Sequence, residues 1–301
     1  MNQMVGFIGL GIMGKPMAKN LLSKGVALMV NDLDKVAVAE LTALGAKSGS
    51  LTKIGEECPI IFTILPNGAI VQNVLFNTGG VTETIKHGSI VVDMSSVTPV
   101  ESHACADKLE KKGVAFLDAP VSGGEPKAID GSLAFMVGGQ QKDFDRIMPY
   151  FEKMGTSALL VGGTGSGSVT KLANQVIVNL NIAAVSEALV MATKAGADPE
   201  LVYKAIRGGL AGSTVLDAKA PLMIDRQFAP GGKISINLKD IKNVMATAHA
   251  IDVPMPMSSQ LLEIMQALKV DGHVDDDHGG IVQYFEKLAQ VEVRRKEEKN
   301  E

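Results

Sequence analysis

The sequence predicts a doubly wound α/β domain with a mostly parallel sheet, followed by an all-α domain. Short β-branched and apolar runs alternate with helical stretches over the first half of the 301 residues, and this alternation is typical of a parallel sheet with helices on both faces. A glycine cluster at 162–165 (GGTG) ends the alternation. Because a single core seldom serves a chain of this length, we expect two domains, at 1–163 and 164–301.

The strands expected in the first domain are continuous apolar runs. They lie at 5–10, 27–30, 60–65, 89–92, 114–117, 133–137 and 158–161. Helical spacing of apolar residues predicts helices at 14–24 and 35–44, with one more between the last two strands. Continuous rather than alternating apolar runs indicate strands that are buried on both faces of the sheet.

The second domain carries apolar residues at helical spacing only. A single long helix is predicted at 169–194, ended by Gly196 and Pro199. Shorter helices are expected near 200–206, 239–249, 258–268 and 280–288. Residues 294–301 are almost all charged, and we expect them to form a frayed tail.

Composition argues against several classes of partner. The net charge is −4 and no basic stripe runs along the chain, which argues against nucleic acid. Cys58 and Cys105 lie far apart and outside any C-x-x-C pattern, which argues against a disulfide framework or zinc site and fits a cytoplasmic protein. We expect no signal peptide. We also expect no membrane partner, because no uninterrupted apolar run reaches the length of a bilayer span.

The turn after the first strand fits the pattern G-x-G-x-x-G. Its residues are Gly9, Leu10, Gly11, Ile12, Met13 and Gly14. Between a strand and a helix, this pattern is the dinucleotide fingerprint of the Rossmann fold: the first glycine permits a tight turn, the second lets pyrophosphate approach the backbone, and the third lets the helix pack closely. The alternative is a glycine-rich turn without a ligand.

Asn31 and Asp32 end the second strand and are expected to border the cofactor. Asp32 lies at about the spacing of the acid that binds the adenosine ribose. Its carboxylate would repel a 2′-phosphate, and Leu33 follows where NADP-selective enzymes usually place arginine, so we expect NAD in preference to NADP. Alternatively, Asp32 caps the next helix.

Two further strand ends are expected to contact the cofactor. Leu65 and Pro66 end one strand, and Ser96 follows another. Ligands of such sheets bind at the carboxyl ends of the strands. Ser96 is equally compatible with a turn or a helix cap.

The segment 118–124 (DAPVSGG) follows a predicted strand and is a candidate anion site. Backbone N–H groups of Gly123 and Gly124, beside the Ser122 hydroxyl, could receive a substrate carboxylate. A simple glycine-rich turn is the alternative reading.

Lys171, Asn174 and Gln175 share one face near the start of the long helix, at spacings i, i+3 and i+4. Polar groups on an otherwise apolar helix are costly to bury unless they are solvated or functional. A partly desolvated lysine can protonate the oxygen that forms when hydride adds to a carbonyl. Asn174 could hold the substrate, and Gln175 could orient the lysine. The alternative is a surface lysine whose stem packs on apolar neighbours.

Two charged segments of the second domain complete the candidates. Lys239 and Asp240 are expected to begin a helix, and by sequence alone they are an ordinary surface pair. The acidic run 275–277 with His278 matches no metal-ligand spacing. We therefore expect a solvated loop there and no metal.

Three stretches resemble the β-hydroxyacid dehydrogenase family, and the similarity extends along essentially the whole chain. They are VGFIGLGIMGKPMAKNL at 5–21, DAPVSGGEPKAIDGSL at 118–133 and GSGSVTKLANQ at 165–175. The resemblance implies a nicotinamide-dependent dehydrogenase in which Lys171 is catalytic, Asn174 contacts substrate and Lys239 contacts the cofactor. It also implies a homo-oligomer, either a dimer or a tetramer.

Further stretches are similar to the family members that reduce tartronate semialdehyde to D-glycerate. They are GGEPKAIDGSL, KLANQVIVNLNIAAVSEAL and AIRGGLAGSTVLDAKAP. The resemblance implies this reaction, in glyoxylate or glucarate breakdown, with 3-hydroxyisobutyrate or succinic semialdehyde as alternative substrates. Gly279 and Gly280 depart from the Ser and Ala of close relatives. A non-catalytic cofactor-sensing module and an imine reductase are the rival readings, and Lys171 argues against both.

Overall fold

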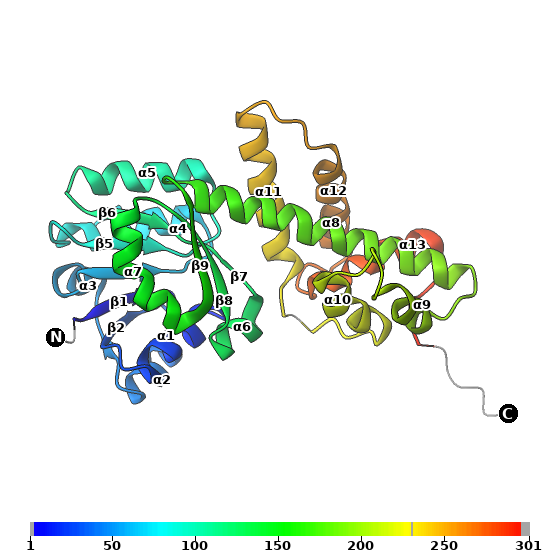
Figure 1. Ribbon diagram of the computed structural model, residues 1–301, viewed down its shortest axis with the longest axis horizontal. Coiled ribbons are helices and arrows are strands. Elements are labelled where there is room, and N and C mark those ends of the chain that lie inside the picture. The colour runs from blue at the N-terminus through cyan, green and yellow to red at the C-terminus, as the bar shows by residue number, and fades with distance from the viewer. Residues whose placement is uncertain (1–2, 230, 296–301) are drawn as a thin grey trace. The chain divides into compact units, whose positions relative to one another are not determined.

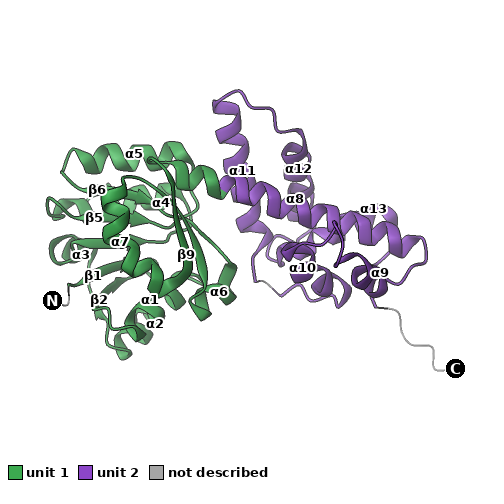
Figure 2. Cartoon of the chain, viewed as in Figure 1, with its two compact units in different colours: residues 1–171 green, residues 172–301 purple. Residues whose placement is uncertain are grey.

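The computed structural model of the chain describes residues 3–229 and 231–295. It divides into two compact units, Met1–Lys171 and Leu172–Glu301 (Figure 2). The division falls inside helix α8 (Ser166–Lys194). We expected the boundary between residues 163 and 164, just before this helix, whereas the two units divide after Lys171.

The first unit is built on a sheet that has nine strands among the described residues. Its strands are β1 (Val5–Ile8), β2 (Leu28–Asn31), β3 (Lys47–Ser48), β4 (Ile60–Thr63), β5 (Ile90–Asp93), β6 (Ala115–Asp118), β7 (Val121–Ser122), β8 (Leu133–Gly138) and β9 (Gly155–Gly162). The order is β3-β2-β1-β4-β5-β6-β8-β7, with β9 also paired to β8. Among the pairings of the described strands, β6–β8 and β7–β8 are antiparallel and the others are parallel. The predicted mostly parallel, doubly wound sheet is confirmed.

Helices cover both faces of the sheet (Figure 1). One core lies under α1 (Gly14–Ser23), α2 (Lys35–Ala43) and α7 (Gln141–Met154). The other lies under α3 (Leu51–Glu57), α4 (Gly68–Phe76) and α5 (Pro99–Glu110). Within β4, Ile60 and Phe62 belong to the first core and Ile61 to the second, because successive side chains of a strand point to opposite faces. This double burial explains the continuous apolar runs.

Several elements of this unit escaped the sequence analysis. They are α3, α4, α5, α6 (Gly124–Asp130), the short helix η1 (Val81–Glu83) and the two-residue strands β3 and β7. Helix α5 has a readable signal, since Thr98 and Glu101 form a capping box with Pro99 in the first turn. Two-residue strands are too short to show periodicity.

The second unit is helical, as predicted. After α8 it contains α9 (Pro199–Ile206), α10 (Thr214–Ile224), α11 (Ile234–Ala250), α12 (Pro256–Val270), η2 (His278–Ile281) and α13 (Val282–Ala289). Helix α11 starts at Ile234, so the expectation that Lys239 begins it is wrong. Helix α10 was not predicted; it contains Pro221, a residue disfavoured inside helices.

The charged tail expected at 294–301 falls mostly outside the described residues, since 296–301 are not described. Within the described part, Arg295 forms ion pairs with Glu200 at 3.0 Å and Asp225 at 3.1 Å. This arginine is therefore held against the second unit by two carboxylates.

Helix α8 is long and apolar enough to cross a membrane, the one such helix in the described parts of the chain. Its best 18-residue window has a mean hydropathy of 1.7, and 33% of that window is buried. The average over this window conceals the polar residues inside it, among them Asn179 and Asn181. Interior helices of water-soluble proteins pass the same test, so it does not by itself assign α8 to a bilayer.

Candidate functional site

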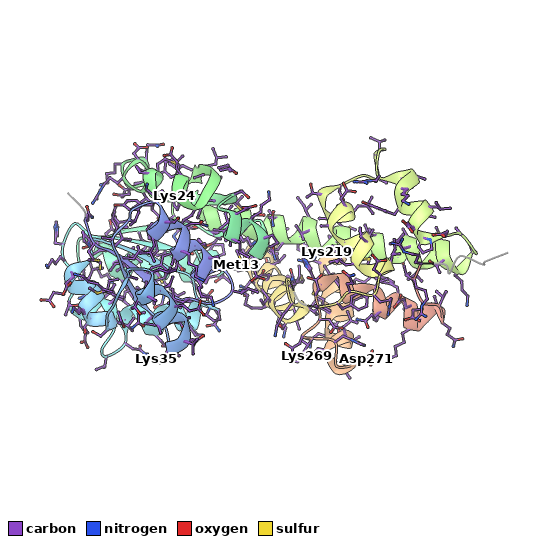
Figure 3. All side chains as sticks on the ribbon, turned by 90° about the horizontal axis from the view of Figure 1, so that it is seen from below. Met13, Lys24, Lys35, Lys219, Lys269 and Asp271 are labelled. Atoms are coloured by element: carbon purple, nitrogen blue, oxygen red, sulfur yellow. The ribbon has the colours of Figure 1, made fainter. Side chains whose placement is uncertain are left out.

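The glycine loop joins β1 to α1 and has one closed side and one open side. Gly9 has φ +99°, and a Cβ on Gly14 would lie 2.0 Å from the Gly9 carbonyl oxygen, so these two positions accept only glycine. A Cβ on Gly11 would meet nothing within 4 Å. Met13, labelled in Figure 3, precedes α1 and gives its N-terminus no side-chain hydrogen bond. Within this turn the Lys15 N–H already donates to the Gly11 carbonyl oxygen at 3.0 Å and Pro16 has no N–H, so a phosphate would depend on the open side of Gly11 and on the helix dipole.

A groove of about 580 Å³ opens beside this loop. Leu10, Gly11 and Ile12 line it from the loop, and Lys15 and Lys19 line it from α1. Asp34 and Glu125 line it too, and both lysines pair with Glu40, at 3.2 and 3.3 Å. Its suitability for a pyrophosphate therefore depends on the helix N-terminus rather than on a surplus of positive side chains.

Asp32 is fixed by backbone groups at the end of β2. Its Oδ2 accepts a hydrogen bond from the Leu10 N–H at 2.5 Å, and its Oδ1 accepts one from the Asp34 N–H at 2.7 Å. Asp34, not Asp32, caps α2 by accepting from the Val36 N–H at 2.9 Å. The capping alternative for Asp32 is therefore wrong, and the carboxylate lies against the glycine loop.

Asn31, the last residue of β2, uses its side chain within the fold. Its Nδ2 donates to the Gly49 carbonyl oxygen at 2.7 Å. The side chain is half-buried, and this bond ties the end of β2 to the segment that follows β3.

A buried carboxyl group ties together the loops that follow β4 and β5. Asp93 Oδ1 accepts from Thr63 Oγ1 at 2.8 Å and from Ser95 Oγ at 2.5 Å. Ser95 Oγ in turn accepts from the Leu65 N–H at 2.8 Å. Burial raises the pKa of Asp93 to about 6. The expected cofactor residues Leu65 and Ser96 thus flank a network that sequence analysis missed.

The network around Asp93 had one readable signal. Thr63 and Asp93 are polar residues that end otherwise apolar strands, and the two are paired in register. Pro66, the next predicted contact, is exposed beyond the network.

Lys171 lies beside the predicted anion segment. Its Nζ donates a hydrogen bond to the Val121 carbonyl oxygen at 2.8 Å. Ser122 ends β7 and is half-buried, while Gly123 and Gly124 are exposed at the start of α6. Lys171 is itself half-buried, and its bond to this segment distinguishes it from a lysine that merely extends into water. The structure therefore brings together an amine and the residues predicted to hold a carboxylate.

Asn174 and Gln175 belong to a hydrogen-bond chain of the second unit. Asn174 Nδ2 donates to Gln175 Oε1 at 3.0 Å, and Gln175 Nε2 donates to Asp240 Oδ2 at 2.6 Å. Asn237 Oδ1 also accepts from Gln175 at 3.2 Å. Gln175 is buried and directed to α11, whereas Lys171 bonds to Val121, so the chain gives no support to Gln175 as the group that orients the lysine.

Asp240 is a buried carboxylate that sequence analysis treated as a surface residue. The residue is 2% exposed, and the Lys239 Nζ lies 3.0 Å from its Oδ1. Lys239 is half-buried inside α11. The predicted cofactor lysine and the amide chain through Asn174 thus meet at one carboxylate.

The acidic run after α12 is only in part the solvated loop that we expected, since Asp275 is exposed but Asp277 is buried. Asp277 is 1% exposed and accepts from Lys219 Nζ at 2.8 Å and from the backbone N–H groups of Gly232 at 3.0 Å and Gly279 at 2.9 Å. Figure 3 labels Lys219. Asp277 is an anchor for two loops. Gly279 and Gly280, the departures from close relatives, are both buried here.

Comparison with known proteins gives matches over almost the whole chain. Residues 4–163 match the family described as the NAD binding domain of 6-phosphogluconate dehydrogenase, and residues 165–285 match the NAD-binding family of NADP-dependent 3-hydroxyisobutyrate dehydrogenase. The 2-hydroxy-3-oxopropionate reductase of Escherichia coli K12 is 43% identical over 95% of this chain and 98% of that protein. The 2-(hydroxymethyl)glutarate dehydrogenase of Eubacterium barkeri is 36% identical over 96% of this chain and 97% of that protein.

The fold also matches solved structures. The 3-hydroxyisobutyrate dehydrogenase of Mycobacterium tuberculosis superimposes with a TM-score of 0.87 at 26% identity, covering 94% of this chain and 99% of that one.

Proposed function

The chain belongs to the 3-hydroxyisobutyrate dehydrogenase-like family of NAD(P)-dependent β-hydroxyacid dehydrogenases, and we propose that within this family it reduces tartronate semialdehyde to D-glycerate. The contact between Lys171 Nζ and the Val121 carbonyl oxygen, at 2.8 Å, carries the proposal, because it sets a proton donor beside the segment suited to a carboxylate. The choice of substrate is supported by the 43% identity to 2-hydroxy-3-oxopropionate reductase.

The residues present fit a dinucleotide. The open side of Gly11 and the uncapped start of α1 would receive the pyrophosphate, and Asp32 would accept hydrogen bonds from the adenosine ribose. Leu65, Pro66, Ser96 and Lys239 are the further contacts that we propose. When bound, the reduced nicotinamide supplies the hydride.

The chain's own residues then handle the carboxylate and the proton. Ser122 and the backbone N–H groups of Gly123 and Gly124 would bind the substrate carboxylate. Lys171 would donate a proton from Nζ to the aldehyde oxygen, which prevents a free alkoxide from building up. Asn174 would hold the substrate hydroxyl group. General acid assistance of this kind contributes about 10²–10⁴-fold to a rate.

We expect tartronate semialdehyde to give the highest kcat/KM in a panel of semialdehydes. The panel comprises tartronate, succinic and methylmalonic semialdehydes, the last being the oxidation product of 3-hydroxyisobutyrate, each measured by initial rates with NADH and with NADPH. The specific contacts of a small polar substrate should separate it from competitors by roughly tenfold or more. A higher kcat/KM with either other semialdehyde would reassign the substrate and leave the reaction class standing.

We expect NADH to be preferred over NADPH. The Asp32 carboxylate is held in place by two backbone N–H groups, so it cannot turn away from a 2′-phosphate. Losing a charge-assisted hydrogen bond costs ~1.5–3 kcal/mol, which predicts a kcat/KM ratio of roughly ten to a hundred. Asp32→Asn should lower this ratio by removing the charge. A preference for NADPH in the unaltered enzyme would contradict the role given to Asp32.

A further inference from the structure

The last residue of β6 binds the first turn of the helix that carries Lys171. Asp118 is 1% exposed. Its Oδ1 accepts from the Gly165 N–H at 2.8 Å, and its Oδ2 accepts from the Ser168 N–H at 2.8 Å. Both oxygens are therefore committed to backbone N–H groups at the start of α8, where a negative charge is also favoured by the helix dipole.

The same turn lies directly on the backbone of the sheet. A Cβ on Gly167 would lie 2.4 Å from the carbonyl oxygens of Asp118 and Met136. A Cβ on Gly138 would lie 2.5 Å from Asp118 Oδ1. Contacts this short exclude any side chain, so the glycines let the helix come close enough for the carboxylate to reach its N–H groups.

Asp118 and Lys171 close a ring of contacts around the proposed substrate segment. Asp118 opens the segment 118–124 and binds the beginning of α8, and Lys171, further along α8, returns to Val121 of the same segment at 2.8 Å. We propose that Asp118 is a positioning residue, which sets the distance between the Lys171 ammonium group and the Ser122–Gly124 carboxylate site. This inference rests on the proposed function, in which Lys171 is the proton donor.

The ring requires a carboxylate at 118 rather than any polar side chain. Asparagine offers one acceptor oxygen, so its Nδ2 would face the N–H of either Gly165 or Ser168, donor against donor. A buried N–H left without an acceptor is unfavourable, and the turn should shift to relieve it. Displacing a catalytic group by about 1 Å can cost about a hundredfold in rate.

The test compares Asp118→Asn and Gly167→Ala with Gly163→Ala as the matched control. A Cβ on Gly163, in the same connection before α8, would meet nothing within 4 Å. For each variant one measures the NADH Kd by fluorescence titration, kcat per NADH-binding site, and KM for the semialdehyde. Counting only the NADH-binding molecules removes any unfolded fraction from kcat.

We expect Asp118→Asn and Gly167→Ala to lower kcat roughly ten- to a hundredfold, with the NADH Kd and the KM changed far less. None of the hydrogen bonds described above joins this ring to the glycine loop or to Asp32, the groups that would hold the cofactor, so the NADH Kd should change little. Gly163→Ala should behave like the unaltered enzyme. Asp118→Asn acts through the carboxylate and Gly167→Ala through the packing of the turn, so agreement between them identifies the position of the turn as the cause.

A wild-type kcat per site in both Asp118→Asn and Gly167→Ala overturns the inference, whatever happens to their melting temperatures. Equal losses in kcat and in NADH affinity also overturn it, because they indicate general disruption. If the proposed function itself were wrong, Lys171→Ala would instead keep the kcat of the unaltered enzyme. A slow Lys171→Ala enzyme beside a fast Asp118→Asn enzyme would reject the positioning role alone.

Discussion

Replacing Lys171 with alanine is expected to lower kcat about a hundredfold or more, while the protein folds and binds NADH. A proton donor acts mainly in the transition state, so its loss appears in kcat, and general acid catalysis contributes about 10²–10⁴-fold. Lys171→Arg should restore little activity, since a guanidinium group does not give up its proton near neutral pH. Steady-state kinetics with NADH and the best semialdehyde of the panel measure both effects.

Lys24 provides a matched control for this experiment. Its Nζ also donates to a backbone carbonyl oxygen, that of Lys153, at 2.8 Å. It lies at the end of α1 away from the glycine loop and is labelled in Figure 3. Lys24→Ala should therefore keep its rate. If Lys171→Ala also kept its rate and melting temperature, Lys171 would be a structural residue, although the dinucleotide site would stand because it depends on other residues.

Replacing Gly11 with alanine is expected to weaken NADH binding without loss of stability. A Cβ at this position meets no protein atom within 4 Å, but it would stand where a pyrophosphate must approach the backbone. The loss of one such charge-assisted contact costs ~1.5–3 kcal/mol, or roughly ten- to a hundredfold in Kd. Fluorescence titration gives the Kd, and thermal unfolding without cofactor gives the stability.

Gly14→Ala should fail in a different way. Its Cβ would lie 2.0 Å from the Gly9 carbonyl oxygen and 2.8 Å from Ile64 Cγ2, so both the melting temperature and the NADH affinity should fall. Gly208→Ala, whose Cβ would also meet nothing within 4 Å, should change neither. Unchanged NADH affinity in Gly11→Ala would show that the open side of the loop is not the pyrophosphate site.

Part of the fold and of the candidate site could be predicted from patterns among residues that are close in the sequence. The strands around Phe62 and Val92 are buried on both faces, and continuous apolar runs state this directly. Gly9 and Gly14 reveal a turn between strand and helix because each meets a local steric demand, whereas Gly11 has an open side. Lys171, Asn174 and Gln175 could be placed on one helix because helical spacing depends only on neighbouring residues.

The sequence by itself therefore determined the two architectures, the glycine loop after the first strand and the residue types near the start of the long helix. Only the tertiary structure decided which groups those residues meet. Asp118 accepts hydrogen bonds from the Gly165 and Ser168 N–H groups, Lys171 donates one to the Val121 carbonyl oxygen, and Asp240 accepts one from Gln175. The physical reason is that burial and hydrogen bonding of a polar side chain are set by residues distant in the sequence. A buried aspartate that anchors a helix and an exposed aspartate on a loop are therefore alike until the chain is folded.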